Sequence, residues 1–250
     1  MKAFWKEHGF HLLFATAVAL VGGWFTGIYT AETLTPALQE EALSALGSLE
    51  LLYAVSALQS AGYALVLGAV GILLAKKLEL WRPMTLRHKG VTVAAATALA
   101  GGALIMALDL LVFAPQSQWI ADSYAVKPNA AVWLASILYG GVVEEIMLRL
   151  FLLSLIALLL WKLFARAADT APTWCIVTAN ILSAMLFAAG HLPSTALATA
   201  LSPVIIVRCF LCNGSLALVF GRLYRLHGIQ YAMLAHAGCH IVMKTIWMML

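Results

Sequence analysis

Residues 130–161 read AAVWLASILYGGVVEEIMLRLFLLSLIALLLW, and this stretch decides the fold. It is about 32 residues long, whereas one helix crosses the hydrocarbon core of a bilayer with about 20 apolar residues. We therefore expect a membrane helix that is tilted, kinked or projecting inward. Its middle holds Glu144, Glu145 and Arg149, three charges in an otherwise apolar segment.

The rest of the chain shares this apolar character. Of its 250 residues, 63% are hydrophobic and 10% are charged, and the mean hydropathy is +0.94. A soluble domain is about 45–50% apolar and about 25% charged, and a domain of this size cannot bury such an excess in its own core. The composition therefore excludes a soluble globular enzyme, a disordered chain and a nucleic-acid-binding protein. We expect an integral membrane protein with the lipid bilayer as its surroundings.

The apolar stretches predict an all-α, polytopic transmembrane helical bundle of about seven spans, because only helices or closed barrels satisfy the backbone in lipid. We expect the first span to be retained rather than cleaved as a signal peptide. Between spans five and six, Pro193 and Pro203 bracket a loop or a re-entrant half-helix. The seven predicted spans are residues 10–29, 51–75, 91–113, 130–161, 173–190, a sixth that ends near Arg222, and 229–250.

Charges in the connecting loops predict the orientation. The loop after the second span carries five basic residues and a single acid, whereas residues 31–50 carry four acids and no Lys or Arg. Basic loops stay on the cytoplasmic side. We therefore expect a cytoplasmic N-terminus and an acidic outer loop, with a short amphipathic helix as an option for the latter. A bacterial inner membrane is the expected location.

The charged residues inside the fourth span are costly. A charge at the centre of a spanning helix costs roughly 2.5–3.5 kcal/mol, so Glu144, Glu145 and Arg149 together cost on the order of 8–10 kcal/mol if unpaired. That sum rivals the whole stability of a typical domain. These side chains must therefore face the interior of the bundle. Other polar residues inside predicted spans are Asp109, His191, Arg208, His236, His240 and Lys244.

Helical spacing assigns partners to some of these groups. Glu145 and Arg149 are four residues apart and can pair along one face. Glu144 is rotated by about 100° from Glu145, which leaves it as the free carboxylate, available as a general base. His236 and His240 also share one helical face. Gly140 and Gly141 allow another helix to approach closely.

Three motifs in this order resemble those of the CPBP family of intramembrane proteases, which includes CAAX prenyl endopeptidases and bacteriocin-processing and self-immunity proteins. Glu144-Glu145-Ile-Met-Leu-Arg149 fits E-E-x-x-x-R, and Phe187-Ala-Ala-Gly-His191 fits F-x-x-x-H. His236-Ala-Gly-Cys-His240 resembles the third motif, which is usually H-x-x-x-N. The resemblance runs from about Trp133 to the C-terminus. It implies one membrane domain over residues 1–250, with variable N-terminal spans in 1–130 and catalytic-motif helices in 131–250.

The resemblance also implies roles. Glu144 would activate a water for attack on a peptide bond of a membrane-associated protein or peptide, and His191 would position that water. His236 and His240 would stabilise the oxyanion. Glu145, Arg149 and Phe187 would support the site structurally.

His240 departs from the family, which usually has Asn at this position. A neutral imidazole can still donate to an oxyanion, but Glu144 with His191, His236 and His240 is also a plausible ligand set for zinc. We favour the glutamic-type mechanism without a cofactor, and zinc is the alternative.

Two other functions fit the same residues. Buried Glu and His side chains form the proton relay of some transporters, and an inactive membrane scaffold would keep the fold without the chemistry. A protease needs these groups to converge around one water-sized site, whereas a relay needs them strung across the bilayer. The complete set of motifs and the absence of an inverted repeat favour the protease.

Overall fold

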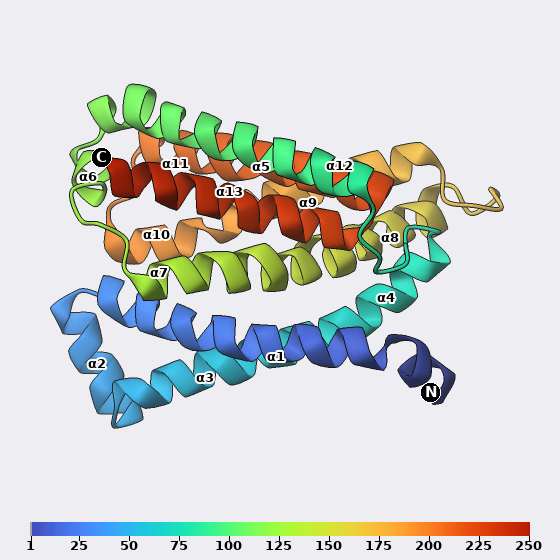
Figure 1. The fold of residues 1–250 in the computed structure, drawn as a ribbon, viewed down its shortest axis with the longest axis horizontal. Helices are drawn as coiled ribbons and strands as arrows, with labels where there is room; N and C mark the ends of the chain where they lie inside the picture. The colour runs from blue at the N-terminus through green and yellow to red at the C-terminus, as the bar shows by residue number, and fades with distance from the viewer. Residues whose placement is uncertain (1) are drawn as a thin grey trace.

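The computed structural model describes residues 2–250, and these are helical almost throughout, with no β-strand among them. The long helices run side by side along the longest axis of the molecule (Figure 1). The all-α bundle predicted from the sequence is therefore confirmed. In chain order, with η marking π- or 3₁₀-helical segments, the elements are α1 (Lys2–Thr33), α2 (Pro36–Leu46), α3 (Leu49–Gly62), η1 (Tyr63–Leu67), α4 (Gly68–Lys77), α5 (His88–Leu108), η2 (Asp109–Phe113), η3 (Ala114–Gln116), α6 (Gln118–Ser123), α7 (Ala130–Leu134), η4 (Ala135–Glu144), η5 (Ile146–Leu153), α8 (Ser154–Phe164), α9 (Thr173–Gly190), α10 (Leu192–Ala198), α11 (Pro203–Cys209), η6 (Phe210–Gly214), α12 (Ser215–His227) and α13 (Ile229–Met249).

The number of spans is close to the prediction. Successive elements join into six segments that are long and apolar enough to cross a membrane: Lys2–Thr33, Leu49–Lys77, His88–Gln116, Ala130–Phe164, Thr173–Ala198 and Pro203–His227. The seventh long helix, α13, does not reach the same apolarity, because its 21 residues include His236, His240 and Lys244. It packs against α5, η4 and α12, so its polar face is covered by other helices.

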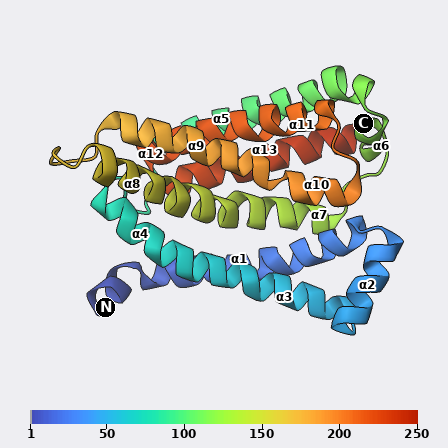
Figure 2. The same ribbon diagram turned by 180° about the vertical axis from the view of Figure 1, so that it is seen from behind.

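The first helix packs against two partners at once. α1 contacts α3 on one side and η4 on the other, and the α1–α3 pair forms a layer along one side of the bundle (Figures 1 and 2). Small residues permit this: a Cβ at Gly27 would lie 2.6 Å from the Cα of Tyr53, and one at Gly22 would lie 2.9 Å from the backbone nitrogen of Tyr139. Close backbone approach of this kind is how membrane helices gain packing energy.

The long fourth segment is continuous but not uniformly α-helical. From Ala135 to Glu144, and again from Ile146 to Leu153, its backbone has the wider π-helical pattern. The segment is therefore a widened helix along most of its motif region. π-Helical turns are rare and often lie at functional sites, and here they flank Glu145.

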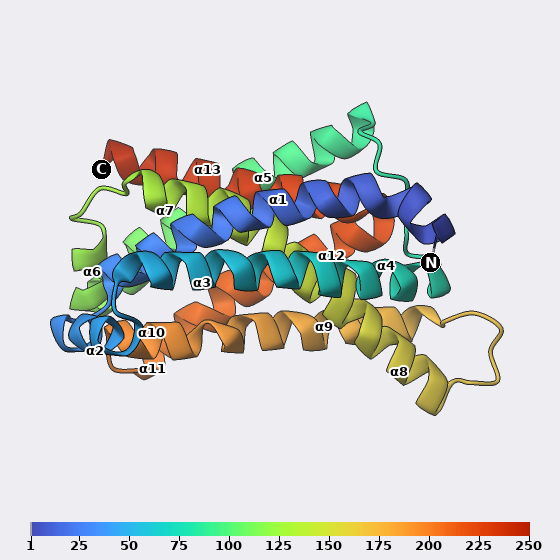
Figure 3. The same cartoon turned by 90° about the horizontal axis from the view of Figure 1, so that it is seen from below.

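The segment between Pro193 and Pro203 is a short helix rather than a long loop. α9 ends at Gly190, the end predicted for span five, and α10 follows directly after His191. In Figure 3, α9 and α10 run along the opposite side of the bundle from α5 and α13. The acidic outer loop contains α2, whose N-terminus is capped by the hydroxyl of Thr35.

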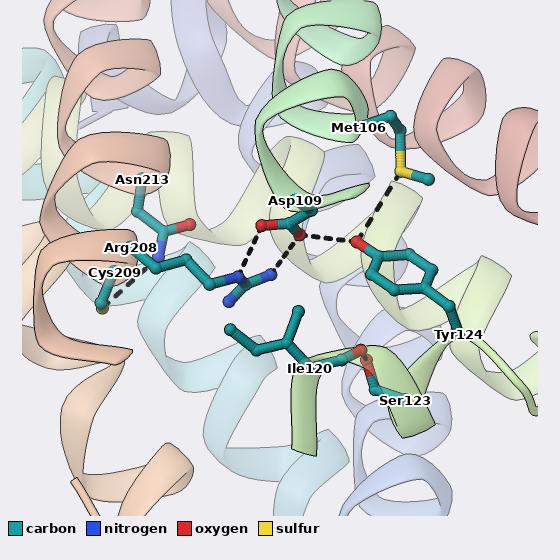
Figure 4. Close-up of polar contacts among 8 residues, drawn as sticks. All are labelled: Met106, Asp109, Ile120, Ser123, Tyr124, Arg208, Cys209 and Asn213. Atoms are coloured by element: carbon teal, nitrogen blue, oxygen red, sulfur yellow. Dashed lines mark hydrogen bonds and ion pairs between the residues drawn. The ribbon is translucent and has the colours of Figure 1, made fainter. Parts of the chain in front are cut away.

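A buried ion pair joins the middle of the chain to α11. The Nε of Arg208 donates to Oδ1 of Asp109 over 2.6 Å, its Nη2 donates to Oδ2 over 2.5 Å, and the hydroxyl of Tyr124 donates to Oδ2 over 2.6 Å (Figure 4). Asp109 is fully buried. Two of the three polar residues that the sequence singles out in the spans beyond the motifs, Asp109 and Arg208, are thus partners; the third is Lys244.

Replacing one partner of the Asp109–Arg208 pair should lower the stability of the protein more per substitution than replacing both together. We expect Asp109→Asn or Arg208→Met to lower the free energy of unfolding by about 3 kcal/mol each, because each leaves a buried charge without its partner. The double variant should lose clearly less than the sum of the two. Thermal unfolding of the purified protein in detergent measures this, and strictly additive losses would contradict the pairing.

Candidate active site

Glu145 connects the fourth segment to α13. Its side chain is fully buried, and Nη1 of Arg149 lies 3.0 Å from its Oε1, the pairing that the four-residue spacing predicts. The Nδ1–H of His236 donates to the same oxygen over 2.8 Å. One carboxylate therefore holds two helices together and fixes which ring nitrogen of His236 carries the proton.

Two aromatic rings surround the guanidinium of Arg149. Its Cζ lies 4.7 Å from the ring centroid of Phe187 and 5.6 Å from that of Phe220. The Nη atoms of Arg149 have no hydrogen-bond acceptor in the described chain, so ring faces take that place through cation–π contact. Phe187 was expected to support the site. Phe220 carries no motif signal, yet its ring also stacks on His236 at 4.7 Å.

Glu144 has a different environment from its neighbour. Arg149 pairs with Glu145 and not with Glu144, and the Glu144 side chain keeps 19% of its surface exposed. Its Oε2 lies 3.9 Å from Nε2 of His236. The proton of the His236 ring is on Nδ1, which donates to Glu145. Nε2 therefore faces Glu144.

His236 and His240 lie on one face of α13, as predicted. Their rings stack with centroids 4.9 Å apart and an interplanar angle of 26°. Gly140 provides the space in front of them: a Cβ there would lie 2.8 Å from Nε2 of His240 and 3.9 Å from Oε2 of Glu144. The side chains of His240 and Glu144 therefore both reach the space in front of Gly140. Nδ1 of His240 is buried without a partner in the described chain.

His191 is near this cluster but makes no hydrogen bond or ion pair with its members in the described chain. Its Nδ1–H donates to the carbonyl oxygen of Phe187 over 2.8 Å, and its ring lies 4.6 Å from the Phe187 ring. Phe187 in turn lies 6.1 Å from His236. The structure therefore brings Glu144, His236 and His240 together directly and connects His191 to them through Phe187.

The zinc alternative requires its four candidate ligands to meet at one point. Within residues 2–250, no three His, Cys, Asp or Glu side chains lie close enough to hold a metal ion. His191 and His236 each donate Nδ1–H to a protein acceptor, which leaves Nε2 of each ring free. Four-coordinate zinc needs its ligands converging at about 2 Å from one point, and Glu144, His191, His236 and His240 do not make that arrangement here.

Comparison with known proteins gives one match. The family model described as "Type II CAAX prenyl endopeptidase Rce1-like" matches residues 126–242, a range that contains all three motifs. No curated protein and no solved structure matches the chain. The match confirms the resemblance drawn from the motifs.

Adjacent glycines should respond differently to a methyl group. Gly140→Ala places its Cβ against the tip of the His240 ring, so we expect peptidase activity to fall at least about tenfold with a near-normal melting temperature. At Gly141 the Cβ would lie 2.6 Å from Cβ and 3.0 Å from Cα of Ala237, so Gly141→Ala should push α13 off η4 and lower the melting temperature.

Activity and thermal unfolding of the two purified variants test this pair. Full activity in Gly140→Ala, or wild-type stability in Gly141→Ala, would contradict the packing described here.

Proposed function

Because residues 126–242 match the model of the Rce1-like type II CAAX prenyl endopeptidases, we propose that this membrane protease hydrolyses its substrate with a water activated by Glu144. The observation that carries the proposal is the division between the two adjacent carboxylates. Glu145 is fully buried and is paired with Arg149 and His236. Glu144 is partly exposed and is not paired with Arg149. Two neighbouring carboxyl groups in unlike surroundings are typical of a pair with separate roles.

Glu144 acts as the general base. It takes a proton from a water molecule while the water oxygen attacks the carbonyl carbon of the scissile peptide bond. The protonated Glu144 then gives its proton to the departing amide nitrogen as the C–N bond breaks. Water is thus divided between the two products, and Glu144 returns to its starting state.

The three histidines position the water and stabilise the charge that develops. His191 holds its proton at Nδ1, so its Nε2 is free to accept a hydrogen bond from the water. His240, with the proton on Nε2, donates toward the space beside Gly140. Such a donor stabilises the oxyanion of the tetrahedral intermediate, and the stacked ring of His236 holds His240 in place. His240 does here what Asn does in most of the family.

The substrate is a membrane-associated protein or peptide that reaches the site from the bilayer. We place the N-terminus and the basic loops on the cytoplasmic side of a bacterial inner membrane, because Lys and Arg gather at one end of the helices. Residues 1–130 form the variable N-terminal part of one membrane domain and residues 131–250 its catalytic part.

The contacts give little support to the two other functions. A proton relay needs polar groups at successive depths, but Glu144, Glu145, Arg149, His236 and His240 gather around one point. An inactive scaffold would have no use for a free carboxylate beside two stacked imidazoles.

Removal of the proposed base should abolish cleavage without unfolding the protein. We expect Glu144→Ala and His191→Ala to lower turnover by at least about 100-fold, with normal folded yield, because neither side chain holds helices together. His227→Ala, at the end of α12, and Glu41→Ala, in α2, are matched controls. The assay uses farnesylated and unprenylated CAAX peptides with the protein in lipid nanodiscs, and mass spectrometry detects the products.

Wild-type cleavage by either Glu144→Ala or His191→Ala would show that the assignment is wrong. If the unaltered protein cleaves neither peptide, the CAAX-type substrate is wrong, and a proteome-derived membrane peptide library becomes the next probe.

Metal removal should leave activity intact under this mechanism. We expect 1,10-phenanthroline to have no effect on turnover, and elemental analysis of the purified protein to show zinc far below one atom per chain. If the chelator abolishes activity and added Zn²⁺ restores it, the zinc mechanism is correct and the glutamic-type mechanism is wrong. The isomer 1,7-phenanthroline, whose two nitrogens cannot chelate one metal ion, controls for non-specific inhibition.

A further inference from the structure

A cavity of about 330 Å³ lies at the basic end of the bundle, away from the active site. We call it the head cavity and define it by Lys77, Glu79, Arg82, Trp161, Asp169 and Arg225. Its apolar floor consists of Leu78, Leu80 and Ile176, all buried. The cavity is thus a half-open hollow with mostly exposed charged residues around a buried apolar base.

A second, smaller cavity lies next to the first. It has a volume of about 150 Å³, lies between α9 and α12, and shares Ile176 and Arg225 with the head cavity. We call it the tail groove and define it by Val177, Asn180, Leu218, Gly221 and Arg222. Val177 and Leu218 are exposed on membrane-spanning segments, so the tail groove faces the region of the acyl chains.

The cations of the head cavity have no protein counter-ion. In the described part of the chain, no carboxylate lies within 4.0 Å of Lys77, Arg82 or Arg225. Arg225 makes a single long contact, 3.5 Å, with the hydroxyl of Thr173. The cavity also contains Glu79 and Asp169, and the tail groove adds Arg222. The two cavities together therefore have four cationic side chains and two carboxylates. An anionic ligand would reduce this excess of positive charge.

The walls that carry these charges are held rigidly. Trp161 donates from Nε1 to the carbonyl oxygen of Ala168 and ties down the loop before α9. Gln230 donates to the carbonyl oxygens of Pro83 and Thr85, which anchors the loop that follows Arg82. Glu79 adopts a positive φ of 57° at the end of α4, a strained conformation that is kept only where surroundings enforce it.

We propose that the two cavities together bind one anionic phospholipid. Its phosphate lies among Lys77, Arg82 and Arg225 in the head cavity, and one acyl chain lies in the tail groove between α9 and α12. Basic pockets between helices at the cytoplasmic membrane surface take phosphate head groups for this reason. A free anion would use the head cavity alone, whereas the adjacent groove with its exposed Val177 and Leu218 fits an amphipathic ligand.

Native mass spectrometry of the detergent-purified chain, titrated separately with dioleoyl-phosphatidylglycerol and dioleoyl-phosphatidylcholine, tests the proposal. We expect tighter binding of phosphatidylglycerol, and a loss of its affinity of about tenfold or more in the Arg82→Gln/Arg225→Gln variant. The charge-matched control is Arg87→Gln/Arg166→Gln, which alters the same end of the bundle outside both cavities and should bind like the wild type.

A second variant tests the groove without altering charge. Leu218→Trp should fill the tail groove and weaken phosphatidylglycerol binding, whereas Val219→Trp, one residue away and equally exposed, should not. This pair also keeps the proposal testable if the double Arg variant fails to fold.

Three results would overturn the lipid site. Equal affinity for phosphatidylglycerol and phosphatidylcholine would show that the cations of the head cavity do not select an anionic lipid. Equal loss in the Arg87→Gln/Arg166→Gln control would show only general electrostatic attraction. Displacement of the lipid by millimolar inorganic phosphate, with no effect of Leu218→Trp, would make the head cavity a site for soluble anions.

Discussion

The carboxylate of Glu145 is the interaction on which the rest of the structure depends. An ionised carboxylate cannot remain unpaired inside a bilayer, and Arg149 and His236 together meet that requirement. Since Arg149 is on the same helix and His236 is on α13, the pairing fixes the two helices at one register. The rings of Phe187 and Phe220 then close around the remaining face of the guanidinium.

The same constraint separates the two adjacent glutamates. With Glu145 committed, Glu144 is left beside Nε2 of His236 and behind the space at Gly140. Because Nδ1–H of His236 donates its hydrogen bond to Glu145, Nε2 is the ring nitrogen that faces Glu144. Support and catalysis are thus assigned to neighbouring residues by their contacts, because the helix directs consecutive side chains to different neighbours.

Sequence patterns foresee what depends on local spacing. The apolar runs give the spans, and spacings of four residues give the Glu145–Arg149 pair and the shared face of His236 and His240. Contacts between distant residues leave no such pattern: Asp109 and Arg208 stand out singly, but only the fold shows that they are partners. Phe220 looks like any apolar residue, and no pattern in the sequence marks the π-helical backbone around Glu145.

Glu145 stabilises the fold, whereas Glu144 does not. Thermal unfolding of Glu145→Gln and Glu144→Gln, compared with the wild type in one detergent, distinguishes these two roles. We expect a large loss of melting temperature for Glu145→Gln, which leaves Arg149 without its counter-charge, and almost none for Glu144→Gln. Equal losses, or a larger loss at Glu144, would contradict this expectation.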